Sequence, residues 1–185
     1  MIERRELFKV LGATLMATRQ GAAQHEHGPP AAVNIEGYAP RFFSDAQYRT
    51  IDRLTDIIIP SDDQSPGAHA AGVRFYADTV LHYADAGTQQ KWRSGLAAVE
   101  ESARSSLNKS FGECSIQEQE HIVAVMARNE TNPSTELELF FRLLKSLAVE
   151  AYSVSEVGLT RYFGYSGNTA IKEFLGCKHP EHQAI

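Results

Sequence analysis

The sequence ends in a segment whose side chains could bind a metal ion. Cys177, His179 and His182 supply a thiolate and two imidazoles, and Pro180 stiffens the turn between the histidines. These groups are ligands for zinc or copper, although a fourth ligand would have to come from elsewhere in the chain. Two other interpretations remain open. Cys177 could form a disulfide with Cys114, or the segment could contact a partner protein.

Carboxylates also occur at spacings that could serve catalysis or metal binding. Asp56, Asp62 and Asp63 belong to a stretch rich in proline and glycine, where aspartates more often accept hydrogen bonds from backbone N–H groups. Glu118 and His121 would share one face of a helix. A ferritin-like di-iron site needs two such motifs and two further glutamates, whereas this sequence has one motif. We therefore predict structural roles for the aspartates and a surface position for Glu118 and His121.

Residues 1–23 have the order of an export signal. Arg4 and Arg5 are followed by Phe8 and Lys9, then by a short apolar run and three small residues. The apolar run is far shorter than the roughly 20 residues that span a bilayer, and paired arginines are typical of the twin-arginine route. An ordinary amphipathic N-terminal helix is the alternative. Because the twin-arginine route carries folded proteins, this signal predicts a periplasmic protein that assembles before export.

Composition indicates one globular domain. The chain has 185 residues, 43% of them hydrophobic, and the roughly 160 that follow the leader suffice for one core but not for two. Few apolar residues and several Pro, Gly and His predict a linker at 24–40, ahead of a domain at 41–185. The formal net charge is -5, and no cluster of Lys and Arg follows the N-terminus. We therefore expect no nucleic-acid partner.

The spacing of apolar residues predicts about five helices and no strands. Capping boxes at Ser44 and Ser115 mark the start of two helices, and Ser134 is expected to begin the last one. The first helix should end before Pro60, and the second should span about 73–86. No run of β-branched residues alternates with polar ones, so the predicted fold is an all-α, single-domain bundle.

One face of each predicted helix is apolar and should form the core. The expected core residues are Tyr48, Ile51, Leu54, Ile58, Trp92, Leu96, Val99, Ala103, Leu107, Ile122, Val123, Met126, Leu137, Phe140, Phe141, Leu144, Leu147, Ala148 and Ala151. In particular, the aromatic residues of the last helix are expected to lie inside the bundle. No internal repeat interrupts this pattern, and a single core follows from it.

Two segments break the helical pattern. Residues 57–73 contain two prolines, two glycines and paired acids, so we expect a rigid connection between the first two helices. Residues 158–182 are rich in glycine and aromatic residues and lack a helical period. Such a tail can wrap its own bundle and also contact a partner, because tyrosines supply contact area at low entropic cost. The candidate interface residues are Pro60, Pro66, Gly67, Tyr162, Phe163, Tyr165 and Asn168.

These segments resemble the gluconate 2-dehydrogenase subunit 3 family, the small (gamma) subunits of membrane-associated, FAD-dependent gluconate and glucose dehydrogenases. The resemblance is carried by Asp56–Pro60, Ser65–Ala68, Ala71–Val73, Phe140-Phe141, Gly164-Tyr165, Gly167-Asn168 and Gly176–His182. It extends over essentially the whole mature chain. Leu175 and Lys178 depart from the family pattern, in which Pro and Thr are common at these places.

The resemblance implies a non-catalytic small subunit that assists folding, assembly and twin-arginine export of a large subunit. In that family the flavin chemistry belongs to a large subunit similar to glucose-methanol-choline oxidoreductases, and electrons pass to a multihaem cytochrome c subunit. We therefore expect FAD in the partner and no cofactor in this chain, which would be periplasmic and could be membrane-associated through the complex.

A search of the sequence for catalytic motifs agrees with this expectation. The chain has no dinucleotide-binding glycine motif after a strand, no Gly-x-Ser-x-Gly, no phosphate loop and no Cys-x-x-Cys-His for covalent haem. The alternative function is a stand-alone exported helical protein that binds a metal or a small ligand. Its site would be the C-terminal segment with Cys177, His179 and His182.

We predict that changing both Arg4 and Arg5 to lysine leaves the precursor in the cytoplasm. The translocase reads the guanidinium pair, and the ammonium group of lysine is only a partial substitute for the planar guanidinium fork. Cell fractionation followed by immunoblotting measures the effect. Lys9→Arg, which keeps the charge and leaves the pair intact, is the control. Undiminished periplasmic yield from the double variant would contradict the twin-arginine prediction.

Overall fold

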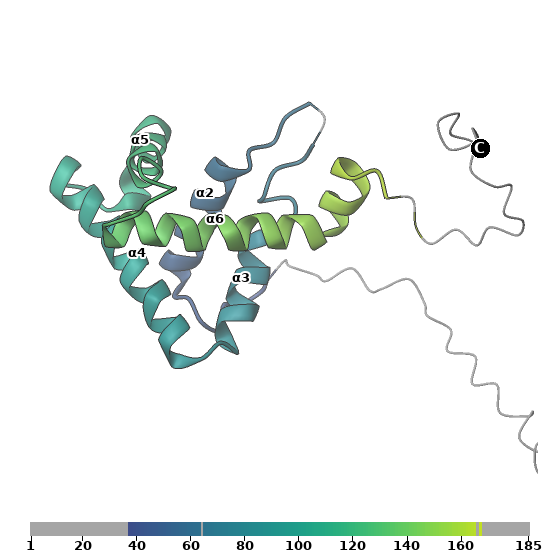
Figure 1. The fold of residues 1–185 in the computed structure, drawn as a ribbon, viewed down its shortest axis with the longest axis horizontal. Coiled ribbons are helices and arrows are strands. Elements are labelled where there is room, and N and C mark those ends of the chain that lie inside the picture. The colour runs from purple at the N-terminus through teal and green to yellow at the C-terminus, as the bar shows by residue number, and fades with distance from the viewer. Residues whose placement is uncertain (1–36, 64, 166, 168–185) are drawn as a thin grey trace, which may run out of the picture. The chain divides into compact units, whose positions relative to one another are not determined.

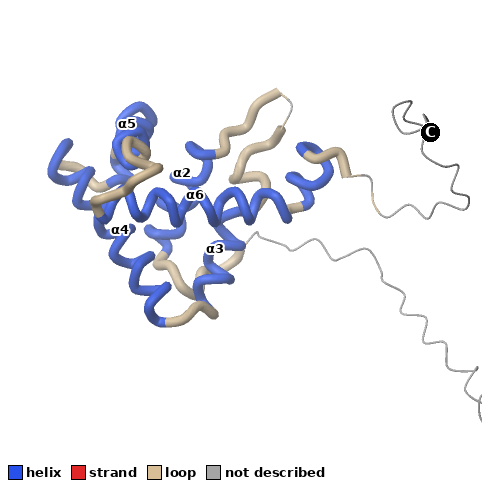
Figure 2. The backbone as a smooth tube through the Cα atoms, viewed as in Figure 1, coloured by secondary structure: helices blue, strands red, loops and turns tan. Residues whose placement is uncertain are grey.

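The computed structural model describes residues 37–63, 65–165 and 167 (Figure 1). Throughout this part of the chain every regular element is a helix (Figure 2), which confirms the predicted all-α fold. The elements are α2 (Asp45–Ile58), α3 (Val73–His82), α4 (Ala86–Leu107), the short turn η2 (Phe111–Glu113), α5 (Ile116–Met126), α6 (Glu136–Val154) and the turn η3 (Gly158–Tyr162). None of the described helices has both the length and the apolar content needed to cross a membrane.

Helix α6 lies at the centre of the bundle, where it contacts α2, α3, α4 and α5 (Figure 1). Helix α4 approaches it at Gly95, which faces Phe140; a Cβ at position 95 would overlap the Phe140 ring. The same ring meets Trp92 of α4 edge-on, with ring centroids 5.4 Å apart. A glycine at position 95 is therefore a steric requirement of the contact between α4 and α6.

The core has two parts, and the predicted inward faces form most of it. The larger part contains buried apolar residues of α2, α3, α4, α5 and the first half of α6, together with Phe43 before α2 and Phe111 of η2. Tyr48, Ile58, Leu107, Leu137 and Leu147 are partly buried at its edge. The smaller part joins the connection between α2 and α3 to the second half of α6. Its buried residues are Ala68, Val73, Ala148, Ala151 and Tyr152.

Side-chain caps set the ends of the first helices. The predicted capping boxes at Ser44 and Ser115 are both formed. The second predicted helix, 73–86, is wrong at its C-terminal end, because α3 stops at His82. Asp85 then caps the N-terminus of α4, so residue 86 begins a new helix. The N-cap at Asp85 thus marks a helix boundary within a segment that apolar periodicity alone had assigned to the second helix.

The start of α6 was predicted one residue too early, at Ser134. The N-cap is Thr135, whose hydroxyl accepts a hydrogen bond from the Glu138 N–H. The Glu138 carboxylate accepts from the N–H groups of Ser134 and Thr135, at 2.8 and 3.0 Å, and from the Asn129 amide. The two backbone donors, in spite of partial desolvation, lower the pKa of Glu138 to about 2.

We predicted no helical structure for residues 158–182, and this prediction is wrong for residues 158–162. They form one turn of π-helix shortly after α6 ends at Val154. Ser155 makes this possible, because its Oγ donates to the Tyr152 carbonyl at 2.7 Å and accepts from the Gly158 N–H at 2.9 Å. A Cβ at Gly158 would overlap the Tyr152 carbonyl oxygen, so this tight reversal needs glycine.

The buried carboxylate of Asp78, on α3, holds the chain that leads into α2. Its Oδ2 accepts from the Tyr38 hydroxyl at 2.7 Å and from the Arg41 N–H at 2.8 Å. Its Oδ1 accepts from the N–H groups of Phe42 and Phe43 at 3.0 and 2.9 Å. Burial acts to raise the pKa of Asp78, but the four donors outweigh it, and the pKa lies below the usual 3.8.

Tyr38 lies within the predicted linker, 24–40, and contacts the folded domain. Its ring meets Phe75 edge-on with centroids 4.7 Å apart, and the Tyr48 ring lies 5.9 Å away. Residues up to 36 lie outside the described part of the chain, so the rest of the linker stays a prediction.

We predict that Asp78→Asn lowers the free energy of unfolding by about 2–4 kcal/mol, because an amide NH₂ would face donors that only an acceptor can satisfy. The stability that ionised Asp78 contributes is present above about pH 4 and is lost as the pH falls through its lowered folded-state pKa. The variant should therefore lose less stability than the native chain on acidification.

Urea unfolding of the full chain, followed by circular dichroism at neutral and acidic pH, measures both effects. Asp45→Asn is the control, because Asp45 is exposed in the first turn of α2 and its replacement removes the same charge. Equal stability of the Asp78 variant and the control would contradict the structural role of Asp78.

Candidate functional site

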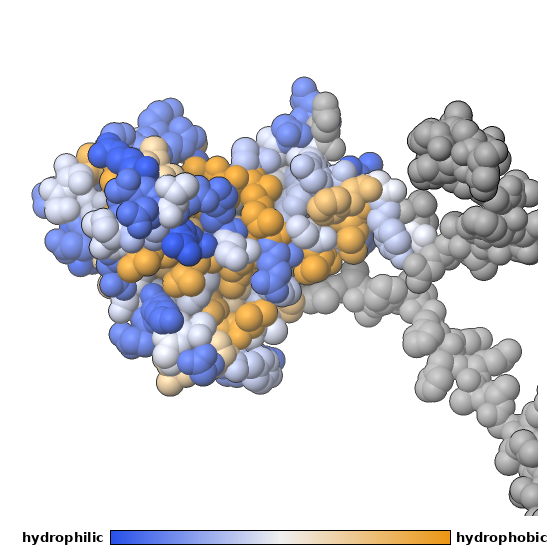
Figure 3. All heavy atoms as spheres, viewed as in Figure 1, coloured by the Kyte–Doolittle hydropathy of each residue, from blue (hydrophilic) through white to orange (hydrophobic). Residues whose placement is uncertain are grey.

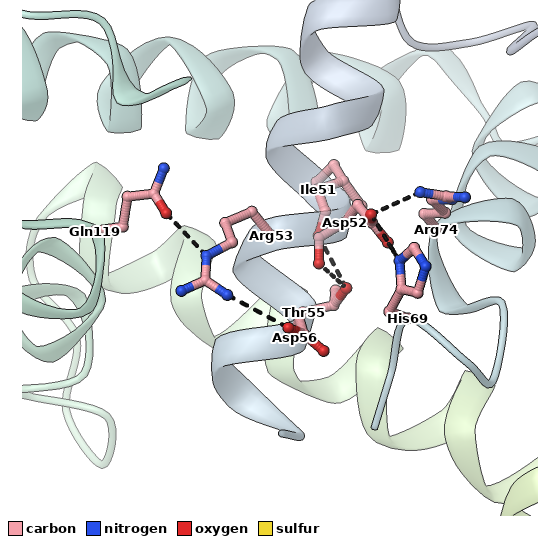
Figure 4. Close-up of polar contacts among 8 residues, drawn as sticks. All are labelled: Ile51, Asp52, Arg53, Thr55, Asp56, His69, Arg74 and Gln119. Atoms are coloured by element: carbon pink, nitrogen blue, oxygen red, sulfur yellow. Dashed lines mark hydrogen bonds and ion pairs between the residues drawn. The ribbon is translucent and has the colours of Figure 1, made fainter. Parts of the chain in front are cut away.

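The connection between α2 and α3, residues 59–72, is fixed by hydrogen bonds at both of its ends. The Ala68 N–H donates to the Ile59 carbonyl at 2.9 Å, and the Val73 N–H donates to the Ala68 carbonyl at 3.2 Å. Asp52 on α2 adds side-chain contacts, since its Oδ2 lies 2.9 Å from His69 Nδ1 and 2.6 Å from an Arg74 nitrogen (Figure 4). These contacts tie the described ends of the connection to each other and to α2, and its rigidity stays a prediction.

The predicted interface residues in this connection differ in accessibility. Gly67 is buried, and a Cβ there would lie 2.6 Å from Ser61 N, so the position serves close contact within the chain. Pro66 is half-buried, and its carbonyl accepts from the Tyr152 hydroxyl of α6 at 2.8 Å. Pro60 is exposed and could contact a partner.

The aspartates near this connection have local partners. Asp62 Oδ1 accepts from the Ser65 N–H at 2.7 Å, which is the backbone-capping role predicted for it. Asp56 instead pairs with Arg53 at 3.3 Å (Figure 4). Arg53 is also held by the Gln119 side chain, whose oxygen lies 2.8 Å from Arg53 Nε. The geometry gives Asp56 and Asp62 structural contacts.

Glu118 and His121 lie on α5, as predicted, and Glu118 helps to cap the N-terminus of this helix. Its carboxylate accepts from the Ser115 N–H at 2.7 Å and from the Lys109 ammonium at 2.9 Å. These contacts lower the pKa of Glu118, the Lys109 ammonium most of all. His121 is exposed. Over the described residues, no group of three or more His, Cys, Asp and Glu side chains is arranged to hold a metal ion.

Cys114 is buried at the start of α5, and its thiol donates to the Ser110 carbonyl at 3.3 Å. Burial raises the pKa of the thiol. Several predicted residues lie outside the described part of the chain: Arg4, Arg5, Phe8, Lys9, Asn168, Cys177, His179 and His182. The disulfide, the C-terminal metal site and the export signal therefore stay predictions.

The outward face of α6 carries an apolar stripe that the described part of the chain leaves uncovered. Leu139, Leu143 and Val149 are 47%, 37% and 49% exposed, and their spacing places them on one side of the helix. Figure 3 shows apolar surface along this helix. The opposite side of α6, with Phe140 and Leu144, is buried in the core. Helix α6 therefore exposes three large apolar side chains, among polar ones such as Arg142 and Ser146, on the side away from the core.

A groove of about 770 Å³ lies over this stripe. Its charged rim includes Lys91 of α4, Glu136 and Arg142 of α6, and the ion pair between Lys145 and Glu130, at 2.7 Å. An apolar centre with a charged rim is the usual composition of a protein–protein interface. We call the stripe and its rim the α6 face.

Exposed aromatic rings follow the α6 face at the end of the helix. Tyr162, Phe163 and Tyr165 are 67%, 58% and 46% exposed. Tyr162 meets Phe163 edge-on with centroids 5.0 Å apart, and it lies 6.4 Å from Tyr152 of α6. The structure thus leaves three predicted interface residues exposed beyond the C-terminal end of α6, in addition to the α6 face, which was not predicted.

The α6 face escaped the sequence analysis because only the inward side of this helix was interpreted. The remaining apolar residues, Leu139, Leu143 and Val149, were assigned to no surface. A signal was present: Leu139, Leu143 and Val149 add a second apolar side to a helix whose first side was already complete. These three residues alternate with the exposed polar residues Arg142, Ser146 and Glu150, so the sequence signal for a second apolar surface was weak.

Comparison with known families identifies the class of this protein. An all-α domain with one uncovered apolar face has the features of a subunit. The family model of gluconate 2-dehydrogenase subunit 3 matches residues 45–169, more than half of the chain, and the protein belongs to that family. This confirms the resemblance found in the sequence. Comparison with curated proteins and with solved structures gave no match.

We predict that Tyr152→Phe loosens the 59–72 connection and lowers the free energy of unfolding by about 1 kcal/mol, the usual contribution of one hydrogen bond. The lost hydroxyl donates to the Pro66 carbonyl and contacts the Ser65 hydroxyl. Hydrogen exchange of residues 60–72 should accelerate. Tyr76→Phe, which removes an exposed bond to Glu150, is the control and should change stability by less than about 0.5 kcal/mol. Unchanged exchange would show that α6 does not hold the connection.

Proposed function

We propose that this chain is the non-catalytic small subunit of a periplasmic, flavin-dependent sugar or alcohol dehydrogenase. In this role it would assist the folding, assembly and twin-arginine export of the large catalytic subunit. Membership in the subunit 3 family supports the role, because the family is named for one subunit of a dehydrogenase. The observation that carries the proposal is the uncovered α6 face, which a partner subunit would cover.

The energetics of the α6 face favour a protein partner. Full burial of an exposed leucine or valine side chain contributes about 1.5–3 kcal/mol. The α6 face offers Leu139, Leu143 and Val149, each of them partly exposed, and Tyr162 and Phe163 are exposed beyond the C-terminal end of α6. Tyrosine is enriched among the residues that dominate binding energy at interfaces. Burial of these side chains against a partner would favour a complex.

The rigidity of α6 also favours association. The helix contacts four other helices, and its close approach to α4 is fixed at Gly95. A preformed surface avoids most of the entropic cost of ordering side chains and backbone on binding. The small subunit would thus present a finished template on which a larger partner could complete its own fold.

The expected partners follow from the proposed role. A large subunit of the glucose-methanol-choline type would hold FAD and the substrate site, and a multihaem cytochrome c subunit would accept the electrons. The leader with Arg4 and Arg5 would direct the assembled pair to the twin-arginine translocase. The pair could then associate with the membrane through the complex.

We predict that Leu139→Gln combined with Leu143→Gln weakens the complex by about tenfold or more, because side chains at the centre of an interface each contribute more than about 1 kcal/mol. Both residues are exposed in this chain, so the helicity of the isolated protein should not change. A tagged copy purified from its native host first identifies the large subunit. Co-expression then measures its co-purification, flavin content and periplasmic activity.

Ile116→Gln is the matched control, because Ile116 is 56% exposed on α5, outside the α6 face. The control should retain the partner at the native level. Equal retention by the double variant, or full activity and export of the large subunit without this chain, would refute the proposal. Sugar oxidation by the isolated small chain would refute its non-catalytic part.

A further inference from the structure

A second groove, of about 660 Å³, lies between α2 and α4 and is closed at one end by η2. It shares no lining residue with the groove of the α6 face. Its floor contains the buried residues Leu96 and Phe111. Gln119 joins its walls, since the side chain amide donates to the Phe111 carbonyl at 3.0 Å and its oxygen accepts from Arg53.

The charge of this groove is opposite in sign to that of the whole chain. Its lining includes four arginines, Arg49, Arg53, Arg93 and Arg104, against a single acid, Glu100. The chain as a whole has a net charge of -5. The Glu100 carboxylate accepts a hydrogen bond from the Phe111 N–H at 3.2 Å. The lining therefore has an excess of three positive charges.

Two of the arginines are held in place by neighbouring groups. Arg53 is fixed between Gln119 and Asp56 (Figure 4). The Arg93 guanidinium lies over the Phe42 ring, 4.5 Å from its centroid. By contrast, Arg49 and Arg104 are exposed and have no ion-pair partner among the described residues. The groove thus combines two oriented guanidinium groups with two that are free to bind an anion.

The spacing of the arginines defines the length of the ligand. Arg49 and Arg53 are one turn apart on α2, whereas Arg93 and Arg104 are three turns apart on α4, a separation of about 16 Å at the helical rise per residue. A lone phosphate or carboxylate would reach only one or two of these groups. An extended peptide of about five residues, at about 3.3 Å per residue, would span all of them.

We propose that this groove, which we call the arginine groove, binds an acidic segment of a partner polypeptide. The carboxylates of the segment would pair with Arg49 and Arg104 and then with the two oriented guanidinium groups. Arginine suits this role because its planar fork matches a carboxylate with two hydrogen bonds. The positive charge of the arginine groove would also attract an acidic partner and so increase the rate of association, although the chain as a whole is negatively charged.

This inference is independent of the proposed function, because the arginine groove and the α6 face share no residue. The test needs no flavoprotein. If the groove fails to bind the peptide, the subunit proposal is unaffected, and if the subunit proposal fails, the inference about the groove is unaffected. The probe is a fluorescein-labelled peptide of alternating glutamate and serine, mixed with the full chain and followed by fluorescence anisotropy.

We expect Arg49→Gln with Arg104→Gln to weaken peptide binding by about tenfold, because it removes two charge-assisted contacts. Arg41→Gln with Arg128→Gln is the charge-matched control, since both side chains are exposed and neither lines the groove. Ala97→Glu is a second test, because it places a carboxylate on an exposed position in the groove without altering an arginine. It should weaken binding to a similar extent, and circular dichroism should show native helicity in every variant.

Three results would overturn the inference. Equal weakening by the control pair would show attraction by overall charge rather than by the groove. Displacement of the peptide by inorganic phosphate, at constant ionic strength, would indicate a site for a small anion. Tighter binding of duplex DNA than of the peptide, with the same dependence on Arg49 and Arg104, would indicate a nucleic-acid site.

Discussion

Helix α6 carries apolar side chains on its outer side that the described part of the chain leaves exposed, and the other features of the domain follow from how this helix is packed. Its inner side, with Phe140 and Leu144, organises the core because four helices contact it. Its outer side, with Leu139 and Leu143, remains in solvent. The two sides are coupled, since the contact of Gly95 with Phe140 that completes the core also fixes how the outer side is presented. In the proposed complex, folding and association would use opposite sides of one helix.

Much of the fold could be predicted because its signals are local. The capping boxes at Ser44 and Ser115 depend on residues three positions apart, and apolar periodicity depends on the geometry of one helix. Errors arose where two local signals competed, as at Asp85, whose cap separates α3 from α4. The role of Asp78 could not be read in the same way, because its four donors come from more than 30 residues away in the sequence.

The candidate surfaces were predictable only in part, for a related physical reason. A sequence shows which side chains are apolar or charged, but coverage depends on how the helices pack. Tyr162 and Phe163 stood out because they lie outside any regular apolar pattern, and the structure leaves both in solvent. Leu139 lies outside the predicted core face, but only the packing of α6 shows that no other described element covers it. The arginine groove likewise combines residues from α2 and α4 that are 40 or more positions apart.

The place of α6 in the chain order also has a consequence for biosynthesis. It is the last α-helix of the described part of the chain, and it contributes to both parts of the core. During translation α2 to α5 leave the ribosome without the neighbour against which their apolar sides close, so the core can close only after α6 has been made. If the leader with Arg4 and Arg5 directs a folded protein, as proposed above, export would have to wait for the synthesis of α6.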